Sequence, residues 1–205
     1  MTTLSVVIPT YERPDDLERC LHSLNPKRQS IEEEFEVLVT DDSSGMESKC
    51  LVENRFPFAS WDQGKKNGPA GNRNAGVARA KGEWIVFLDD DCFAMPEYLE
   101  AYSNAISQYP ETQVFEGRIF PDRPRITWAE GCPSNEKGGM LWTSNLCIRK
   151  DLFTEMNGLD ERFRVAFEDV DLAYRLKQRG MESRFIAEAG VCHPWRTLRK
   201  GRKNW

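Results

Sequence analysis

The chain has 205 residues, of which 40% are apolar and 30% charged, and its net charge is −5. This length suits one large domain or two closely joined lobes, and the composition predicts an ordinary buried core rather than disorder. No stretch approaches the roughly 20 apolar residues of a membrane span, and residues 1–3 lead straight into a strand pattern without a signal-peptide core, so we expect a cytoplasmic protein.

The first half of the chain alternates apolar runs with helix signals. Residues 4–8 predict a buried strand that Pro9 stops, and Pro14, followed by acidic residues and then apolar residues at helical spacing, predicts a helix. Three further elements follow: a strand at 35–40, a glycine-bearing loop at 68–76 that enters a helix at 75–80, and a buried strand at 84–88.

The second half is more mixed. It predicts a helix from 95 to about 109, strands at 114–120 and 141–148, an irregular proline-rich stretch at 121–133, and a helix at 169–179. Alternating strands and helices predict an α/β fold with a mainly parallel central sheet flanked by helices.

Polar clusters follow three of the predicted strands. These clusters are Thr10-Tyr11-Glu12, Asp41-Asp42 and Asp89-Asp90-Asp91. Ligands bind beyond the carboxyl ends of the strands in such sheets, so the three clusters predict one site at one edge.

The three consecutive aspartates are the strongest sign of a metal. Their mutual repulsion is relieved by a divalent cation, and hard oxygen ligands favour Mg²⁺ or Mn²⁺. A solvated turn or a helix cap is the alternative for the triplet taken alone. His193 is a candidate further ligand, although a lone histidine is more often structural.

Glu168 and Asp169 fall in the first turn of the last predicted helix, where the helix dipole stabilises an ionised carboxylate. Such a group can act as a general base, and ordinary helix-start chemistry is the alternative. Arg73, in the glycine-bearing segment, offers a planar donor fork for phosphate or a nucleobase, or forms a surface salt bridge.

These motifs, taken in order, closely resemble family 2 glycosyltransferases, which have the GT-A fold. The resemblance rests on SVVIPTYER at 5–13, VTDDSS at 39–44, RNAG at 73–76, GEWIVFLDDD at 82–91, GLDERF at 158–163 and EDVDL at 168–172. It implies a nucleotide-sugar-binding half at 1–95 and an acceptor-binding and base half at 96–205 of one GT-A domain.

The resemblance also implies roles for individual residues. Asp41 would face the base of the nucleotide, Asp90 the ribose, Asp91 the metal, and Asp169 would be the catalytic base. Three aspartates allow two registers of the D-x-D motif, so Asp89 is a candidate for both metal and nucleotide. The complete sets are Thr10, Tyr11, Glu12, Asp41, Arg73, Asp89 and Asp90 for the nucleotide, Asp91, Asp89 and His193 for Mn²⁺ or Mg²⁺, and Glu168, Trp142 and Asn145 beside the base.

The expected activity is transfer of a sugar from a nucleotide-diphosphate donor, a UDP-sugar by family frequency, to a glycan, glycolipid or other hydroxyl acceptor. One base suits inversion, since the second acid, Asp171, is turned away from Asp169. A sugar nucleotidyltransferase is the alternative enzyme, but it usually carries a glycine-rich loop after the first strand. A non-catalytic nucleotide-sugar-binding module is the alternative outside enzymes.

The charge distribution bears on the partners. Residues 196–205 hold five basic residues and no acidic one, which leaves the rest of the chain strongly acidic. An acidic body argues against nucleic acid as the main partner. The basic tail at 196–205 is a candidate for peripheral contact with an anionic membrane, and a frayed, solvated terminus is the alternative.

Overall fold

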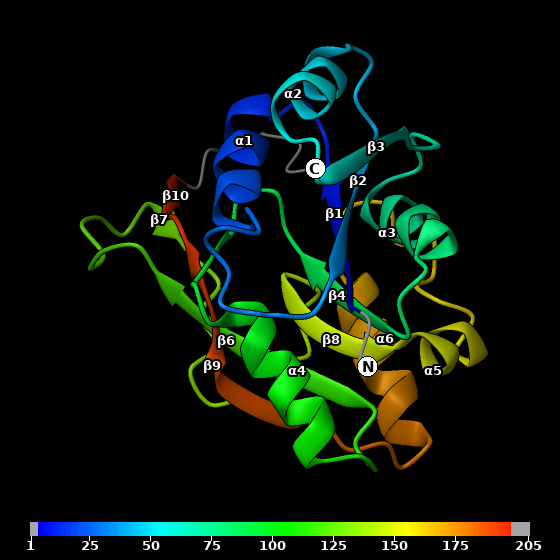
Figure 1. Cartoon of the computed structure of the whole chain (residues 1–205). Helices are drawn as coiled ribbons and strands as arrows, with labels where there is room; N and C mark the ends of the chain where they lie inside the picture. Colours follow the sequence, from blue (N-terminus) through cyan, green and yellow to red (C-terminus); the bar gives the residue numbers. More distant parts are fainter. Residues whose placement is uncertain (1–3, 198–205) are drawn as a thin grey trace.

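The computed structural model describes residues 4–197, which form an eight-stranded sheet with helices on both faces and a separate two-stranded ribbon (Figure 1). The N-terminal half supplies four parallel strands in the order β3-β2-β1-β4, and each crossover contains a helix. The elements are β1 (Leu4–Thr10), α1 (Pro14–Ser23), β2 (Phe35–Asp41), α2 (Glu47–Arg55), β3 (Ala59–Gln63), α3 (Pro69–Arg79) and β4 (Trp84–Leu88).

The C-terminal half extends the sheet in the order β8-β6-β9-β5. Strand β8 is antiparallel to β4 and β6, whereas β9 is parallel to β6 and antiparallel to β5. The elements are β5 (Phe93–Ala94), α4 (Tyr98–Gln108), β6 (Val114–Pro121), β7 (Glu130–Gly131), β8 (Asn145–Arg149), α5 (Lys150–Glu155), α6 (Glu168–Gln178), β9 (Arg184–His193) and β10 (Arg196–Thr197). The predicted α/β fold is confirmed, with a parallel N-terminal half and a mixed C-terminal half.

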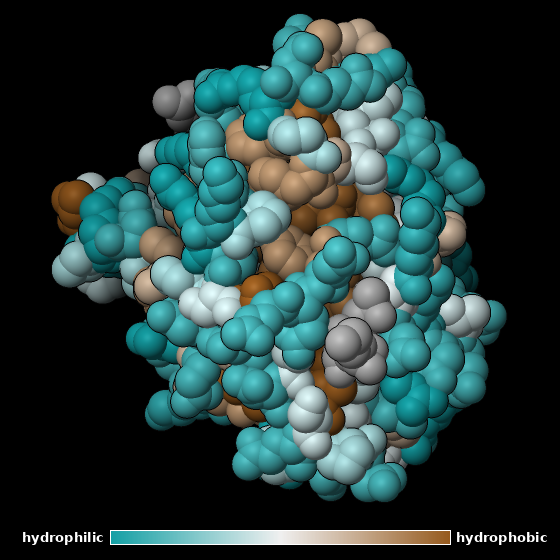
Figure 2. All heavy atoms as spheres, in the orientation of Figure 1, coloured by the Kyte–Doolittle hydropathy of each residue, from teal (hydrophilic) through white to brown (hydrophobic). Residues whose placement is uncertain are grey.

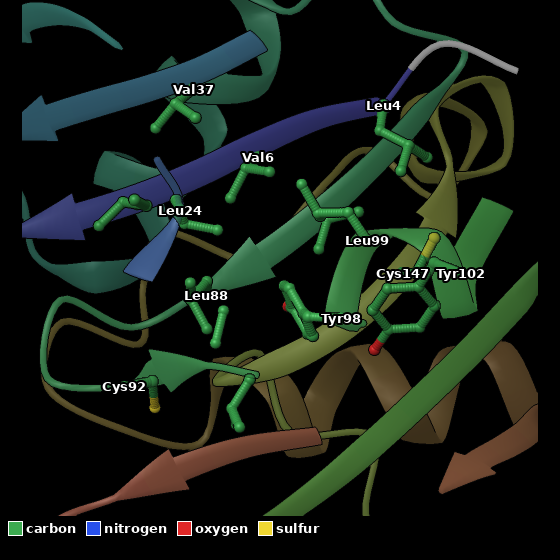
Figure 3. Packing of buried hydrophobic residues seen from close by; sticks show 14 of the residues in the cluster. Leu4, Val6, Leu24, Val37, Leu88, Cys92, Tyr98, Leu99, Tyr102 and Cys147 are labelled. Carbon is green, nitrogen blue, oxygen red and sulfur yellow. The ribbon is translucent and has the colours of Figure 1, made fainter. Parts of the chain in front are cut away.

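Strand β1 is the centre of the core. It is buried along its whole length because β2 and β4 flank it and helices cover both faces. Leu4 and Val6 pack with the side of α4 that carries Tyr98 and Tyr102, and the sticks of Figure 3 point into this shared core. Val7 faces the opposite way, toward α3. Each large side chain buried in this way contributes about 1.5–3 kcal/mol.

The structure corrects two boundaries expected from the sequence. Strand β1 does not stop before Pro9 but continues through it, and Pro9 pairs with β2. The pairing of β1 with β4 ends at Val7, so no residue of β4 needs the backbone N–H that proline lacks. Helix α3 begins at Pro69, so most of the glycine-bearing segment is helical rather than a loop.

The glycines of this segment serve close packing. A Cβ atom on Gly76 would lie 2.5 Å from a methyl carbon of Val7 in β1, and one on Gly68, whose φ is +95°, would lie 2.4 Å from the Arg164 carbonyl oxygen. They let α3 approach the sheet and the segment before α6, which brings Arg73 to the edge where the strands end.

One buried carboxylate organises the approach to β8. Glu116 of β6 is 2% exposed, and its oxygens accept hydrogen bonds from the backbone N–H groups of Gly139, Met140 and Leu141 at 2.7–3.2 Å. Ser183 also donates to it, at 2.9 Å. Burial raises the pKa of Glu116, but these donors outweigh burial and hold the pKa below its usual value.

We expect Glu116→Gln to lower the free energy of unfolding by about 1.5–3 kcal/mol at neutral pH, because an amide replaces a charged acceptor. A group whose pKa is depressed on folding contributes stability above its unfolded pKa, about 4.3 for Glu. The difference between parent and variant should therefore shrink as pH falls from about 4.3 through the lowered pKa. Urea titrations across this range measure it, with Glu136→Gln, an exposed partner of Arg118, as the control. Equal losses in both variants would contradict the role of Glu116.

Candidate functional site

The carboxyl ends of β1 and β4 converge as the sequence predicted. The Thr10 hydroxyl at the end of β1 donates to Asp90 just beyond β4, over 2.7 Å. A cavity of about 350 Å³ opens beside this contact. The start of α6 and residues of the basic end of the chain also line it, through Glu168, Asp169 and Arg196.

Asp90 is buried beside like charge. Burial, followed by the charge of Asp91, raises the pKa of Asp90 to about 7, against the opposing effect of Arg13. The Arg13 guanidinium lies 3.2 Å from Asp90 and 3.6 Å from Asp91. Asp90 therefore joins strand β1 to the site through Thr10 and Arg13.

Asp91 and His193 form the pair best suited to a metal. Both are at most 5% exposed, and Asp91 Oδ2 lies 3.4 Å from His193 Nε2 at the end of β9. Asp91 Oδ1 is buried without a hydrogen-bond partner, which is the state expected of an oxygen that awaits a ligand. His193 Nδ1 lies 2.8 Å from the Pro194 carbonyl oxygen, so the tautomer that donates there leaves Nε2 free to coordinate.

Two further residues beside this pair, Cys92 and Arg196, affect whether a cation can bind there. Cys92 lies within the same cluster of possible ligand atoms, but burial raises the pKa of its thiol well above the usual value and keeps it protonated. Arg196 of β10 contacts Asp91 and is also 3.2 Å from Asp16. A cation held by Asp91 and His193 would therefore compete with Arg196 for the same carboxylate.

Arg73 bridges the acidic triplet and the start of α6. It is 4% exposed and pairs with Asp89 on one side and with Glu168, at 3.0 Å, on the other. Asp89 therefore lies with Arg73, whereas Asp91 lies with His193. Burial raises the pKa of Glu168, and Arg73 opposes this.

Asp169 is the more accessible of the two acids of α6 that line the cavity, Glu168 and Asp169. It is half-buried, lines the cavity, and forms no salt bridge within residues 4–197. Its Oδ1 accepts the Val170 N–H at 2.8 Å, and burial raises its pKa. A carboxylate in this position can accept a proton from a hydroxyl group in the cavity.

A second cavity of about 420 Å³ adjoins the first and shares Val165 with it. Tyr11 and Asp42 line it, and Asp42 accepts the N–H groups of Lys66 and Gly68 at 3.0 and 3.1 Å. The two cavities are therefore neighbours, one beside the acidic triplet and the other beside Tyr11 and Asp42.

Three nucleotide candidates, Thr10, Asp41 and Glu12, do not line either cavity. Asp41 is fully buried, and its oxygens accept the Ser43 N–H at 2.8 Å and the Trp61 indole N–H at 3.2 Å. Glu12 is exposed with φ +52°, and its N–H donates to the Ser43 hydroxyl at 2.7 Å.

The two candidates beside the base are placed differently. Trp142 lines the first cavity. Asn145 is 1% exposed and is not among its lining residues; its amide donates to the carbonyls of Arg118 and Ala189, and its oxygen accepts the Tyr102 hydroxyl at 2.6 Å. These bonds join β8 to β6, β9 and α4.

Sequence reasoning did not single out three residues of this site. In the sequence, Arg13 is the last residue of the SVVIPTYER motif, Asp42 is the second residue of the Asp41-Asp42 cluster, and Arg196 is the first residue of the basic tail. Nothing in the sequence marks Arg196 as a neighbour of Asp91, because they are brought together by the pairing of β10 with β7. The remaining residues of the tail, 198–205, lie outside the described part of the chain.

Known proteins match this chain in sequence and fold. The family model of glycosyl transferase family 2 matches residues 5–148. An uncharacterized glycosyltransferase of Haemophilus influenzae is 31% identical over 191 residues, covering 85% of this chain and 62% of the relative. The N-acetylglucosaminyl-diphospho-decaprenol L-rhamnosyltransferase of Mycobacterium tuberculosis is 26% identical, covering 93% of this chain and 75% of the relative.

Solved structures support the same fold. S. aureus TarS residues 1–349, crystallised with UDP-GlcNAc, superposes with a TM-score of 0.77 at 20% identity, covering 98% of this chain and 60% of that one. The match confirms the GT-A architecture. The family model covers more than half of the chain, and the chain belongs to glycosyl transferase family 2.

Proposed function

We propose that this chain transfers a sugar from a nucleotide-diphosphate donor, a UDP-sugar, to an acceptor hydroxyl with inversion. The observation that carries the proposal is one cavity that is lined both by Asp169 and by Asp91, whose carboxylate lies 3.4 Å from His193. TarS, a structural neighbour, was crystallised with UDP and with UDP-GlcNAc. The chain spans 62% of the length of its Haemophilus relative. The activity of the whole relative is therefore a proposal for this chain.

Asp91 and His193 would hold Mn²⁺ or Mg²⁺, which neutralises a leaving diphosphate when bound. Arg13 lies close enough to this carboxylate to add positive charge beside the phosphates. Of the two registers of the D-x-D motif, we propose the one in which Asp91 holds the metal and Asp89 positions Arg73; the contacts of Asp91 with His193 and of Asp89 with Arg73 support it.

The chain's own residues account for the transfer step. Asp169 removes the proton of the acceptor hydroxyl as its oxygen forms a bond to the anomeric carbon. The bond from that carbon to the diphosphate oxygen breaks, and its electron pair leaves with the nucleotide. One displacement of this kind inverts the anomeric centre and needs no second carboxylate.

For the acceptor we propose a chemical class rather than a single molecule. Relatives are named for lipid-linked acceptors, including the GalNAc(5)-diNAcBac-PP-undecaprenol β-1,3-glucosyltransferase of Campylobacter jejuni, which is 37% identical over 97 residues. We propose a glycan or glycolipid hydroxyl, used in polysaccharide biosynthesis. A cytoplasmic location stays a prediction.

We expect Asp91→Ala to abolish the manganese-dependent part of UDP binding, since it removes the carboxylate beside His193. Asp89→Ala should retain that part, because Asp89 pairs with Arg73 instead. Calorimetric titration of UDP with and without Mn²⁺ compares the two variants. Loss of metal dependence in Asp89→Ala alone would move the metal site to the other register.

We expect Asp41→Ala to weaken UDP binding by about 1.5–3 kcal/mol, the value of a hydrogen bond to a charged group, with metal affinity little changed. Asp42→Ala is the matched comparison, because Asp42 lines the second cavity and Asp41 does not. If only Asp42→Ala weakens binding, the base faces Asp42 and the assignment of Asp41 fails.

We expect Asp169→Asn to reduce turnover about 10²-fold or more while UDP affinity persists. The base must be ionised, and burial raises the pKa of Asp169, so activity should fall with decreasing pH at values above the usual Asp range, about 3.9. Glu168→Gln is the comparison, since Glu168 is paired with Arg73 and should matter more for stability.

Transfer and donor hydrolysis, measured for both variants, decide the assignment. Loss of turnover in Glu168→Gln with activity kept in Asp169→Asn would make Glu168 the base. A parent protein that binds UDP-sugars but shows neither transfer nor hydrolysis would be a binding module.

A further inference from the structure

Exposed apolar side chains gather at the start of α6 and along one of its faces. Val170 and Tyr174 are one turn apart, at i and i+4, and Val165 and Phe167 stand just before the helix. All four are between 52% and 66% exposed, and they are four of the nine large apolar side chains that are exposed in the described part of the chain. Single exposed apolar residues are common, but a group of four needs an explanation.

Three of these side chains form a continuous path, which we call the α6 stripe: Phe167, Val170 and Tyr174. Helical side chains lean toward the N-terminus of their helix, so Tyr174 leans toward Val170 and Val170 toward Phe167. A helix rises 1.5 Å per residue, so the path is about 10 Å long. The buried face of α6, which carries Leu172 and Leu176, packs into the core without the stripe.

The stripe begins at the cavity that contains Asp169. Val165 and Phe167 line that cavity together with Asp169, whereas Val170 and Tyr174 do not line it. A molecule with a hydroxyl group at Asp169 therefore passes Phe167 on its way out, and the next surface that it meets along α6 is apolar.

Phe167 breaks three local preferences at once. Its φ is +78°, a left-handed conformation that is unusual for a bulky side chain. It is the N-cap of α6 and gives no side-chain cap, although Ser, Thr, Asp or Asn is favoured there. Its aromatic ring is also mostly exposed. Strained residues of this kind are concentrated at sites of function, and the next two residues of the chain are Glu168 and Asp169.

The polar groups around the stripe indicate which part of an acceptor lies where. Thr143 and Ser144 line the cavity with Asp169, so a hydroxyl-bearing head group finds polar contacts there. Along α6 the charged neighbours Asp171 and Arg175 bind each other at 2.7 Å. An aliphatic chain needs no hydrogen-bond partner and fits this surface, whereas a further sugar ring would leave its hydroxyl groups without one.

A protein partner fits the stripe less well, because the surface is small. A standard protein interface buries about 800 Å² on each partner, whereas a whole aromatic side chain offers about 150–250 Å². The few half-exposed side chains at the start of α6 fall well short of that area, but they are enough for one chain of a small amphiphile.

We propose that the acceptor is an amphiphile with an aliphatic chain next to the reacting head group, and that this chain lies on Phe167, Val170 and Tyr174. The inference rests on the proposed transfer reaction, which puts the acceptor hydroxyl at Asp169. Each methylene that the stripe removes fully from water raises affinity about fourfold.

Binding of alkyl glycosides to the full chain tests the proposal without turnover. The probes are methyl and octyl β-glycosides of glucose and of N-acetylglucosamine, kept below the concentrations at which they form micelles. Calorimetric titration in the presence of UDP and Mn²⁺ measures their affinities. For at least one head group, the octyl glycoside should bind the parent about tenfold or more tightly than the methyl glycoside, because several methylenes are partly buried.

Val170→Ser/Tyr174→Ser should reduce this gain to about threefold or less, and UDP affinity should persist because neither residue lines the two cavities. The matched control is Ile126→Ser/Trp128→Ser, which changes two exposed apolar residues of the loop between β6 and β7 and should keep the full gain. This loop projects beside β7, away from α6, in Figure 1, and the projection ends in hydrophobic atoms in Figure 2.

Phe167→Asn separates the function of this residue from folding. Asparagine tolerates the left-handed conformation, so the variant should have a Tm about 2–4 °C higher than the parent, while the octyl gain falls threefold or more. Differential scanning calorimetry measures the first effect. A lower Tm would show that Phe167 stabilises the fold, and would contradict its assignment to the acceptor.

The contrary outcomes are distinct. No octyl gain in the parent for either head group, or an equal gain in Val170→Ser/Tyr174→Ser, overturns the proposal. Equal weakening of methyl and octyl glycosides by Phe167→Asn overturns it in favour of a sugar ring on Phe167. Loss of self-association in Val170→Ser/Tyr174→Ser, measured by sedimentation equilibrium, overturns it in favour of an interface between two copies.

Failure of the proposed transfer reaction gives a different result. A parent that shows the octyl gain but neither transfers nor hydrolyses UDP-sugars contradicts the reaction and not the surface. A parent that transfers sugar to water-soluble glycans but shows no octyl gain contradicts the surface and not the reaction.

Discussion

Mutual repulsion among buried carboxylates is the constraint around which the site is arranged. Asp90 and Asp91 are adjacent in sequence and at most 4% exposed, and Asp89 and Glu168 lie nearby. Ionised groups buried together are destabilised both by lost hydration and by one another. Both effects act on Asp90, whose pKa is raised to about 7 by burial and then by the charge of Asp91.

Three arginines from separate parts of the chain offset this charge. Arg13 precedes α1, Arg73 lies in α3 and Arg196 lies in β10, and each pairs with at least one member of the acidic triplet. Buried ion pairs contribute little net stability, because desolvation offsets their attraction. The same pairs nevertheless fix where α3 and β10 meet the strand ends. On our proposal, a cation held by Asp91 and His193 would neutralise that carboxylate, and Arg13 and Arg196 would then be available to the phosphates of the donor.

The sequence predicted the parts of this site that depend on local pattern. Buried strands with acidic ends are visible in one segment at a time, and the motifs of the resemblance single out Asp91, Asp169 and His193 without any tertiary information. Glycines favour a loop, so the pattern at 68–76 predicts one, whereas α3 uses Gly76 to pack closely against Val7. Strand β3 is polar and partly exposed, so it lacks the apolar run by which the other parallel strands were found.

Residues whose surroundings come from distant segments could not be placed from the pattern alone. Asn145 follows Ser144, which lines the cavity, but its own partners belong to β6, β9 and α4. Asp41 and Asp42 look equivalent in the sequence, yet the first bonds to Trp61 and the second lines a cavity. Neighbouring residues of a strand point to opposite faces, so which of two carboxylates meets a ligand depends on a register that the sequence does not state.

Arg196 lines the cavity from the short ribbon formed by β7 and β10. The β7–β10 ribbon has only two residue pairs, and a two-stranded ribbon of this size has little stability of its own. Its position is instead set by side chains: Trp195 donates to the Arg123 carbonyl, and Asp122 accepts the Trp195 N–H at 3.3 Å. Arg196 is thus held by the same contacts that order the exposed loop. The loop between β6 and β7 and the strand whose arginine reaches Asp91 are therefore joined through Trp195, and a change in these contacts would alter both the outer surface and the charged site.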